Sequence, residues 1–126
     1  MNVSAPDPES FLPLTFAVYH ILLSLADTER HGYGIIREIE ERTEGQLRMA
    51  PGTLFGAISR MLDQGLIEES DARPAPEEDD SRRRYYRLSE LGRRVAVAES
   101  ERLVSLVKMA RAKRVLPVLA QGGRGE

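Results

Sequence analysis

The sequence predicts a mainly α (α+β) domain whose last helix extends beyond the rest of the fold. Apolar residues recur at helical spacing in four segments, which predicts four helices. Two short segments between the third and fourth helices, residues 66–70 and 83–88, have the composition and alternation of a β-hairpin. The fourth helix would span about 27 residues, or about 40 Å, which exceeds what a domain of this size can cover with its own core.

The first two helices are predicted over residues 11–25 and 32–42. In the first, mostly apolar helix, Pro13 would occupy the first turn, where its missing N–H costs nothing. A turn over residues 27–32 would follow. The second helix has one apolar and one charged face and would end at Gly45, before a short extended strand over residues 46–49.

The third helix would begin near Pro51 and stop at Gly65. Its apolar stripe consists of Leu54, Ile58, Met61 and Leu62, and its polar face carries Thr53, Gly56, Arg60, Asp63 and Gln64. Residues 71–81 are rich in proline and acidic residues, which predicts a mobile loop at the tip of the hairpin. Ser89 would cap the last helix, which is expected to run to about Pro117.

This order of elements is that of a winged helix-turn-helix followed by a dimerisation helix. The predicted parts are a flexible tail (1–10), a DNA-binding domain (11–88, with the wing at about 66–88), a C-terminal dimerisation helix (89–117) and a second flexible tail (118–126). The distal apolar stripe of the last helix, Leu103, Leu106, Val107 and Ala110, requires another chain to cover it, most simply a second copy.

Composition narrows the class of protein further. The chain has 126 residues without cysteine, of which 41% are hydrophobic and 30% charged, as in a soluble globular domain. A disulfide framework, a thiolate zinc site and a cysteine nucleophile are therefore excluded. The sequence contains neither a membrane-spanning run nor a secretory signal, so a cytoplasmic protein without a membrane partner is expected.

Charge is distributed unevenly along the chain. Residues 1–80 carry 6 basic and 16 acidic side chains, a net charge of −10, whereas residues 81–126 carry 12 basic and 4 acidic, a net charge of +8. A concentrated basic segment can bind phosphate even though the whole chain has a net charge of −2. A solvated charged surface is the alternative reading.

Three blocks of sequence resemble the PadR-like transcriptional regulators. Residues 31–35 (HGYGI) resemble the family's "(Y/H)GY-x-I" motif, and residues 51–67 resemble its "GTLY-P-x-L-x-R-L-x-x-x-G-L-I" helix. Residues 83–92 resemble the family's "R-x-Y-Y-x-L-T-x-x-G" motif. The resemblance implies a dimeric transcriptional repressor of the short type, with a single C-terminal helix.

The chain departs from this pattern at four points. Phe55 stands where the family has tyrosine, so a hydroxyl that could bond a phosphate is missing, and Gly56 stands where the family has proline. Ser89 replaces threonine and caps a helix equally well. The sequence lacks tryptophan, on which some short family members stack planar drugs at the dimer interface.

The third helix carries the candidates for reading DNA. Arg60 could bond guanine in a bidentate way, and Gln64 could read adenine. Thr53 lies near the helix N-terminus, where a phosphate would be favoured, and Gly56 would allow close backbone approach. Arg48 precedes the helix and could reach the DNA backbone. An ordinary solvated helix face is the alternative for these residues.

A cluster of arginines at the wing is expected to contact phosphates, because the guanidinium fork matches their geometry. It consists of Arg82, Arg83, Arg84 and Arg87. The alternative pairs these arginines with the acidic residues 77–80 of the same hairpin. Tyr33 and Tyr86 resemble core positions of the PadR-like family, which implies that both bury the ring and offer the hydroxyl to a backbone partner.

The sequence has no catalytic motif, metal-ligand spacing or cofactor motif, so neither an enzyme nor a bound metal or cofactor is predicted. A winged helix that binds protein instead of DNA is the main alternative function. A small hydrophobic or aromatic effector could lie between the last helix of one chain and the first helix of the other. Its candidate lining residues, which could also be ordinary core, are Phe11, Phe16, Tyr19, Leu103 and Val107.

Overall fold

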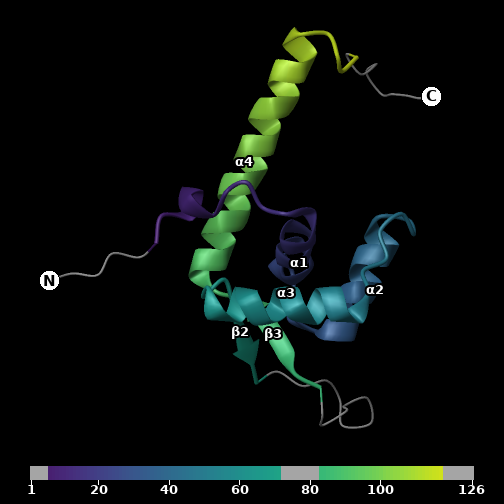
Figure 1. Cartoon of the computed structure of the whole chain (residues 1–126), viewed down its shortest axis with the longest axis vertical. Coiled ribbons are helices and arrows are strands. Elements are labelled where there is room, and N and C mark those ends of the chain that lie inside the picture. Colours follow the sequence, from purple (N-terminus) through teal and green to yellow (C-terminus); the bar gives the residue numbers. More distant parts are fainter. Residues whose placement is uncertain (1–5, 72–82, 118–126) are drawn as a thin grey trace, which may run out of the picture.

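The computed structural model describes residues 6–71 and 83–117. Three helices and a small sheet form the body of the molecule, and a long last helix rises from it (Figure 1). In chain order the elements are the 3-10 helix η1 (Pro8–Phe11), α1 (Phe16–Ala26), β1 (Arg30–His31), α2 (Gly32–Arg42), α3 (Pro51–Asp63), β2 (Ile67–Ser70), β3 (Tyr85–Leu88) and α4 (Glu90–Ala112). The predicted mainly helical α+β fold is confirmed.

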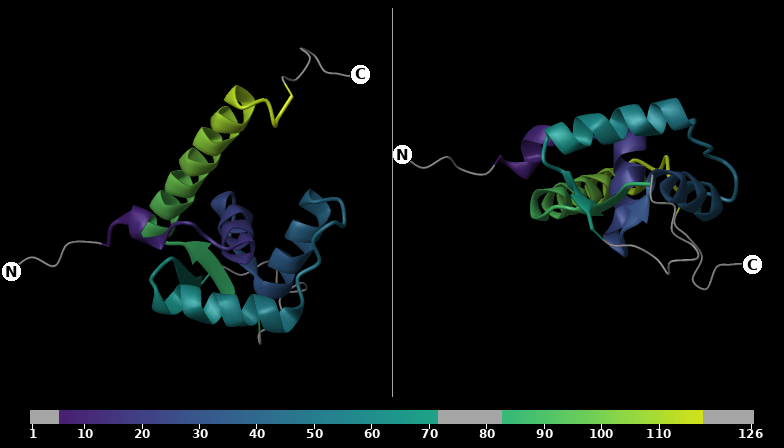
Figure 2. Two further views of the ribbon diagram at one scale, coloured as in Figure 1. Left: turned by 45° about the horizontal axis from the view of Figure 1, so that its top comes forward. Right: turned by 90° about the horizontal axis from the view of Figure 1, so that it is seen from below.

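One apolar core joins all of these layers. α1, α2 and α3 each contribute residues that are fully buried, such as Ile21, Ile35 and Leu54. The sheet adds Ile67 and Tyr86 to the same core. The apolar stripe of each helix therefore faces a common centre. α3 lies at the edge of the body (Figure 2), and its polar side chains are exposed.

The sheet has three antiparallel strands in the order β1-β3-β2. Glu69 lies opposite Tyr86 across β2 and β3, and Arg30 lies opposite Tyr86 across β1 and β3. The predicted strand over residues 46–49 is wrong, because the short strand lies before α2 and not after it. β3 has two edges, and the chain leaving α1 pairs with the edge that β2 does not use.

The N-terminal segment also differs from the prediction. Pro13 precedes α1 and forms a cis peptide bond with Leu12, and the helix begins at Phe16, where the hydroxyl of Thr15 accepts the N–H of Val18 at 3.2 Å. The backbone N–H of Leu14 is directed to the buried carboxylate of Glu99 in α4. Residues 12–15 therefore form an irregular segment with a bend at Pro13 rather than the first turn of a helix.

Residues 8–10, predicted as part of a flexible tail, belong to η1. Asp7 caps this 3-10 helix by accepting the N–H of Glu9 at 3.0 Å. Phe11, its last residue, is partly buried against the core. The N-terminal boundary of the ordered domain therefore lies before residue 10, and the predicted tail over residues 118–126 lies outside the described residues.

The junction between β3 and α4 is tightly packed. Ser89 caps α4 by accepting the N–H of Gly92 at 2.9 Å, and its hydroxyl donates to the carbonyl of Gly65. Gly65 has a positive φ of 78°, as the turn after α3 requires. A Cβ on Gly92 would overlap the carbonyl oxygen of Leu66. Glycine at position 92 thus lets the first turn of α4 touch the backbone at the start of the wing.

α4 is shorter than predicted but still extends beyond the body of the molecule. It has 23 residues, or about 35 Å, and ends at Ala112, where the N–H of Val115 bonds the carbonyl of Ala110 at 3.0 Å. Its first half packs on α1 and η1, and its second half projects away from them (Figures 1 and 2). In the part of the chain that the structure describes, none of the helices is long and apolar enough to cross a membrane.

Candidate DNA-binding surface

The outward face of α3 is lined mainly by small residues. Leu54, Ala57, Ile58 and Met61 are buried, so the opposite side of the helix presents Gly52, Gly56 and Ser59, with the exposed carboxylate of Asp63 at its C-terminal end. The N-cap is Ala50, which makes no side-chain hydrogen bond to the first turn. The first-turn N–H groups of α3 are therefore open to an outside acceptor such as a phosphate.

Two kinds of side chain flank this small-residue face. Thr53, Arg60 and Gln64 lie on one side of the helix and are exposed. Phe55 and Leu62 lie on the other side, each 37% exposed. Phe55 and Arg60 are five residues apart, which places them about 140° apart around the helix. α3 thus has a polar flank (Thr53, Arg60, Gln64) and an apolar flank (Phe55, Leu62).

Arg60 is the cation best placed to reach a base. One of its terminal nitrogens lies 3.6 Å from the position that a Cβ on Gly56 would occupy, so the guanidinium extends over the small-residue face. Of the carboxylates in residues 6–71 and 83–117, none forms an ion pair with Arg60. Close approach of the backbone to DNA at Gly56 stays a prediction, because the guanidinium of Arg60 lies over this position in the free chain.

The N-terminus of α2 lies beside the apolar flank. His31 caps the helix through Nδ1, which accepts the N–H of Gly34 at 3.0 Å. Tyr33 was predicted to be buried, but it is 51% exposed and packs edge-on against Phe55 with 5.6 Å between ring centroids. The prediction for Tyr33 is wrong because Tyr33 lies on the side of α2 away from the buried residues Gly32, Ile35 and Ile39.

Tyr86 is buried, as predicted, with 6% of its surface exposed. Burial and the nearby carboxylate of Glu69 raise the pKa of Tyr86, and the guanidinium of Arg84 partly offsets this increase. The hydroxyl therefore remains protonated at neutral pH. Tyr86 belongs to the core and supports β3 from behind, while its neighbours Arg84 and Arg87 are exposed.

The wing arginines have partners on the sheet and on α2. Arg84 pairs with Glu69 at 3.6 Å, and Arg87 pairs with Glu68 at 3.1 Å. A terminal nitrogen of Arg83 lies 3.2 Å from Nε2 of His31. In the structure, the carboxylate partners of Arg84 and Arg87 therefore come from β2. The alternative pairing with residues 77–80 cannot be followed, because those residues and Arg82 lie outside the described part of the chain.

Exposed pairs of this kind contribute at most about 1 kcal/mol, so a phosphate can replace the carboxylate at little cost. Arg48 also forms an exposed ion pair in which a phosphate could replace the carboxylate. It is 75% exposed, pairs with Glu40 at 3.1 Å, and lies in the segment that leads into α3. Of the predicted phosphate contacts that the structure describes, Arg48, Arg84 and Arg87 are exposed and Arg83 is partly exposed, and each has a partner in the free chain.

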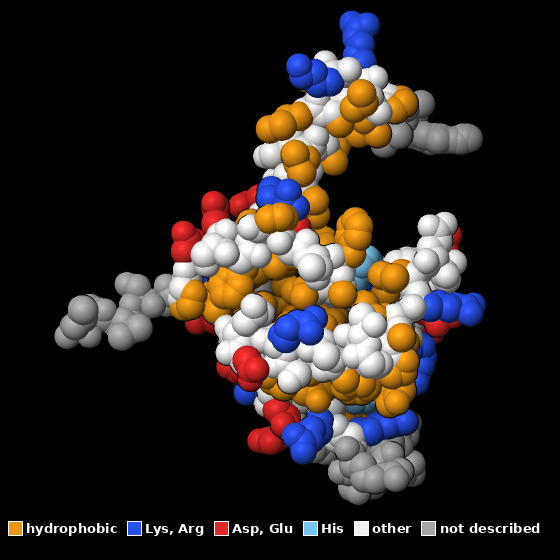
Figure 3. Space-filling model, viewed as in Figure 1, with side chains coloured by type: hydrophobic (Ala, Val, Ile, Leu, Met, Phe, Trp, Pro, Cys, Tyr) orange, Lys and Arg blue, Asp and Glu red, His pale blue; other side chains and the backbone are white. Residues whose placement is uncertain are grey.

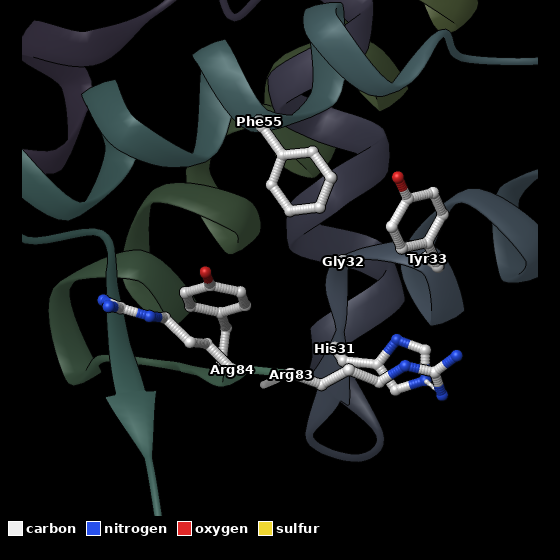
Figure 4. Close-up of a pocket in the computed structure, with 7 residues that line it drawn as sticks. His31, Gly32, Tyr33, Phe55, Arg83 and Arg84 are labelled. Carbon is white, nitrogen blue, oxygen red and sulfur yellow. Dashed lines mark hydrogen bonds between the residues drawn. The ribbon is translucent and has the colours of Figure 1, made fainter. Parts of the chain in front are cut away.

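A cavity of about 510 Å³ opens between α2, α3 and β3. Phe55 points into it from α3, with Tyr33 on one side and Arg84 on the other (Figure 4). Its lining residues are His31, Gly32, Tyr33, Phe55, Arg83, Arg84 and Tyr86. This aromatic contribution is not among the sequence-based predictions. The available signal was a phenylalanine placed outside the buried stripe of α3.

Three of the five residues predicted to bind an effector come together. Tyr19, Leu103 and Val107 line a cavity of about 400 Å³ between α1 and α4, together with Ser100, Val104, Lys108 and Arg111. The hydroxyls of Tyr19 and Ser100 are 2.6 Å apart. Phe11 instead packs against the core, and Phe16 is 81% exposed at the start of α1.

The projecting half of α4 carries exposed apolar side chains (Figure 3). The predicted interface residues Leu106 and Val107 are 46% and 40% exposed, and Leu103 and Ala110 are partly exposed. Val104 and Met109 extend this surface, with 54% and 59% of their area exposed. The prediction that this stripe is not covered by the body of the same chain is consistent with the structure.

Comparison with known proteins agrees with this geometry. The model of the "Transcriptional regulator PadR-like family" matches residues 21–98, more than half of the chain. An uncharacterized protein of Lysinibacillus sphaericus is 32% identical over 73 residues, which are 58% of this chain and 64% of that protein, so the chain spans slightly less than two thirds of this relative.

Two solved structures have the same fold. The hsRosR-S4 complex of H. salinarum RosR is 25% identical with a TM-score of 0.65, over 86% of this chain and 92% of that one. A PadR family transcription regulator from Clostridium difficile is 20% identical with a TM-score of 0.65, over 78% of this chain and 97% of that one. The winged helix-turn-helix, the long last helix and the match of the family model together establish that the chain belongs to the PadR-like family of transcriptional regulators.

Proposed function

We propose that this chain acts as a homodimeric transcriptional repressor that reads a pseudo-palindromic DNA operator. The observation that carries the proposal is the outward side of α3. Its small-residue face has Arg60 extended across it, and the guanidinium is exposed without an ion pair among the described residues. A helix with this surface fits the major groove of DNA.

Each side chain on the polar flank has a chemical role in this proposal. The guanidinium of Arg60 bonds O6 and N7 of a guanine, and the amide of Gln64 reads an adenine. Thr53 and the uncapped first turn of α3 bind a phosphate. Arg48 and the wing residues Arg82, Arg83, Arg84 and Arg87 bind neighbouring phosphates, which position the helix without reading sequence.

The projecting end of α4 supports the homodimer. Side chains such as Leu106 and Val107 have apolar surface in water, and burying it against the same surface of a second copy is favourable. A two-fold dimer places two α3 helices on one face of the DNA. The half-sites are then expected to lie about one helical turn, or about 34–36 Å, apart.

The cavity between α1 and α4 supports regulation by a small effector. Tyr19, Leu103 and Val107 provide apolar lining at the base of the projecting helix. A ligand there changes DNA binding only to the extent that it prefers one separation of the two DNA-reading heads over another. We propose a hydrophobic or aromatic ligand for this cavity and release of DNA as its consequence.

Selection of bound duplexes from a random DNA pool tests the main proposal. A two-fold-symmetric motif is expected from the parent chain. Arg60→Ala should weaken binding to that motif by about 1–3 kcal/mol and relax the base preference at one position per half-site. Arg94→Ala, which removes an exposed arginine from α4, is the matched control and should preserve the motif. A parental motif selected by Arg60→Ala would refute the role of Arg60.

A protein-binding winged helix is the second candidate, and the apolar flank of α3 favours it. Phe55 and Leu62 are both 37% exposed on this helix, and apolar exposed surface is typical of protein interfaces. This candidate predicts no enriched motif and DNA binding that disappears as salt is raised. An enriched motif that survives moderate salt would exclude it as the main function.

A further inference from the structure

We propose that Phe55 contacts the methyl group of a thymine in each half-site of the operator. This inference rests on the proposed DNA-reading function and assigns a base-reading role on the apolar flank of α3. The ring lies in the first half of α3, where recognition helices meet base edges. It is 37% exposed, and it points into the cavity between α2, α3 and β3 instead of into the core (Figure 4).

The ring of Phe55 is held in place by two residues of α2. Gly32 has no Cβ, and a Cβ at this position would overlap the ring, so the backbone of α2 lies directly against it. Tyr33 packs against the ring edge-on, with an angle of 63° between the two planes. Because the ring is positioned before DNA arrives, contact with a base requires little additional ordering.

The chemistry of the cavity selects one kind of base. A phenyl ring offers no hydrogen-bond donor or acceptor, so it can discriminate bases only through apolar contact. Thymine is the base that presents a methyl group in the major groove. Arg83 and Arg84 line the same cavity, and their guanidinium groups suit the phosphates beside that nucleotide. An apolar group next to cations therefore fits a thymine and its backbone.

The volume of the cavity is sufficient for this contact. At about 510 Å³ it is larger than a methyl group needs, so the edge of a base can enter between α3 and the N-terminus of α2. The small residues Gly52 and Gly56 on the neighbouring face of α3 do not hold the helix away from the DNA. Both flanks of α3 can therefore reach base edges, with Arg60 on one side and Phe55 on the other.

Replacing single thymines by deoxyuridine tests the inference directly. This change removes only the methyl group, so base pairing and the hydrogen-bonding pattern are retained. The operator obtained by selection is scanned in this way, and binding of the full chain is measured at fixed salt. At one position per half-site, loss of the methyl should weaken binding about fourfold, and loss from both half-sites about fifteenfold.

Variants of the chain assign the effect to Phe55. Phe55→Ala should bind the thymine and deoxyuridine operators equally, whereas Phe55→Tyr, which keeps the ring, should retain the preference for thymine. Leu62→Ala is the matched control, because Leu62 lies on the same flank, is equally exposed and lies two turns further along α3. This variant should show the parental preference at the same position. Melting curves confirm that each variant is folded.

Three results would overturn the inference while leaving the proposed function intact. The first is a deoxyuridine scan of the parent chain without any sensitive position. The second is a sensitive position that Phe55→Ala preserves. The third is a loss of affinity in Phe55→Ala that is equal for operator and random DNA, as expected if the ring packs on deoxyribose. A random pool without any enriched motif would instead overturn the proposed function, and this inference with it.

Discussion

Replacing Gly92 by alanine should destabilise the protein by about 3 kcal/mol. The new Cβ would overlap the carbonyl oxygen of Leu66 and lie 2.9 Å from its carbonyl carbon, so two backbone segments would have to separate. Overpacking of this kind typically costs about 1–3 kcal/mol. The separation also strains the hydrogen bond from the N–H of Ser89 to the carbonyl of Leu66, now 3.1 Å, whose contribution is about 1 kcal/mol.

Thermal unfolding followed by circular dichroism measures this effect. A loss of about 3 kcal/mol corresponds to a decrease in Tm of about 10–15 °C for a domain of this size. Gly52→Ala is the matched control, since Gly52 also lies in the first turn of a helix but a Cβ there would meet nothing within 4 Å. Its Tm should stay the same or rise by a few degrees. Protein concentration is kept constant because dimerisation affects Tm.

A Gly92→Ala variant that melts within about 2 °C of the parent would refute this reasoning. Such a result would mean that α4 and the start of β2 shift apart without cost. The close approach at Gly92 would then contribute nothing to the position of the wing relative to α4.

Three further predictions concern charge and assembly. The bidentate hydrogen bonds from Arg102 lower the pKa of the buried Glu99 carboxylate. The charged carboxylate therefore stabilises the fold at pH values above the pKa of Glu99 in the unfolded chain. The difference in Tm between the parent and Glu99→Gln should shrink as the pH falls below 4.5. Arg83→Ala should weaken binding to all DNA sequences similarly and reduce the salt slope by about one unit, and an unchanged slope would exclude Arg83 as a phosphate contact. Val107→Glu should sediment as a monomer, because the dimer would bury an unpaired charge, and a chain truncated before Leu103 should do so too; a dimer of either would contradict the role of α4.

Much of the fold follows from local patterns in the sequence. Helical spacing of apolar residues places α2 and α3 within a residue or two of their observed ends, and Ser89 caps α4 as predicted. These signals are reliable because capping and amphipathic periodicity act over a single turn of helix. The family blocks cover the same elements, which explains why the winged arrangement is predictable without coordinates.

The errors in the predicted elements arise where the structure of a segment depends on hydrogen bonds to residues far away in the sequence. Pro13 suits a helix start locally, but the buried Glu99, far along the chain, bonds the N–H of Leu14 in an irregular segment before α1. β1 is defined by its pairing with β3, on the edge that β2 does not use, and nothing in residues 30–31 alone indicates a strand. Long-range pairing of this kind leaves no periodic trace in the sequence.

The candidate surface shows the same division between sequence and tertiary structure. The sequence alone determined that α3 carries Arg60 and that arginines cluster near the wing, since these depend only on residue type and helical spacing. Two features became visible only in the folded domain: Tyr33 packs on Phe55 outside the core, and β2 carboxylates pair with Arg84 and Arg87. A side chain's burial and partners depend on which elements surround it, and that arrangement is set by the packing of the whole domain.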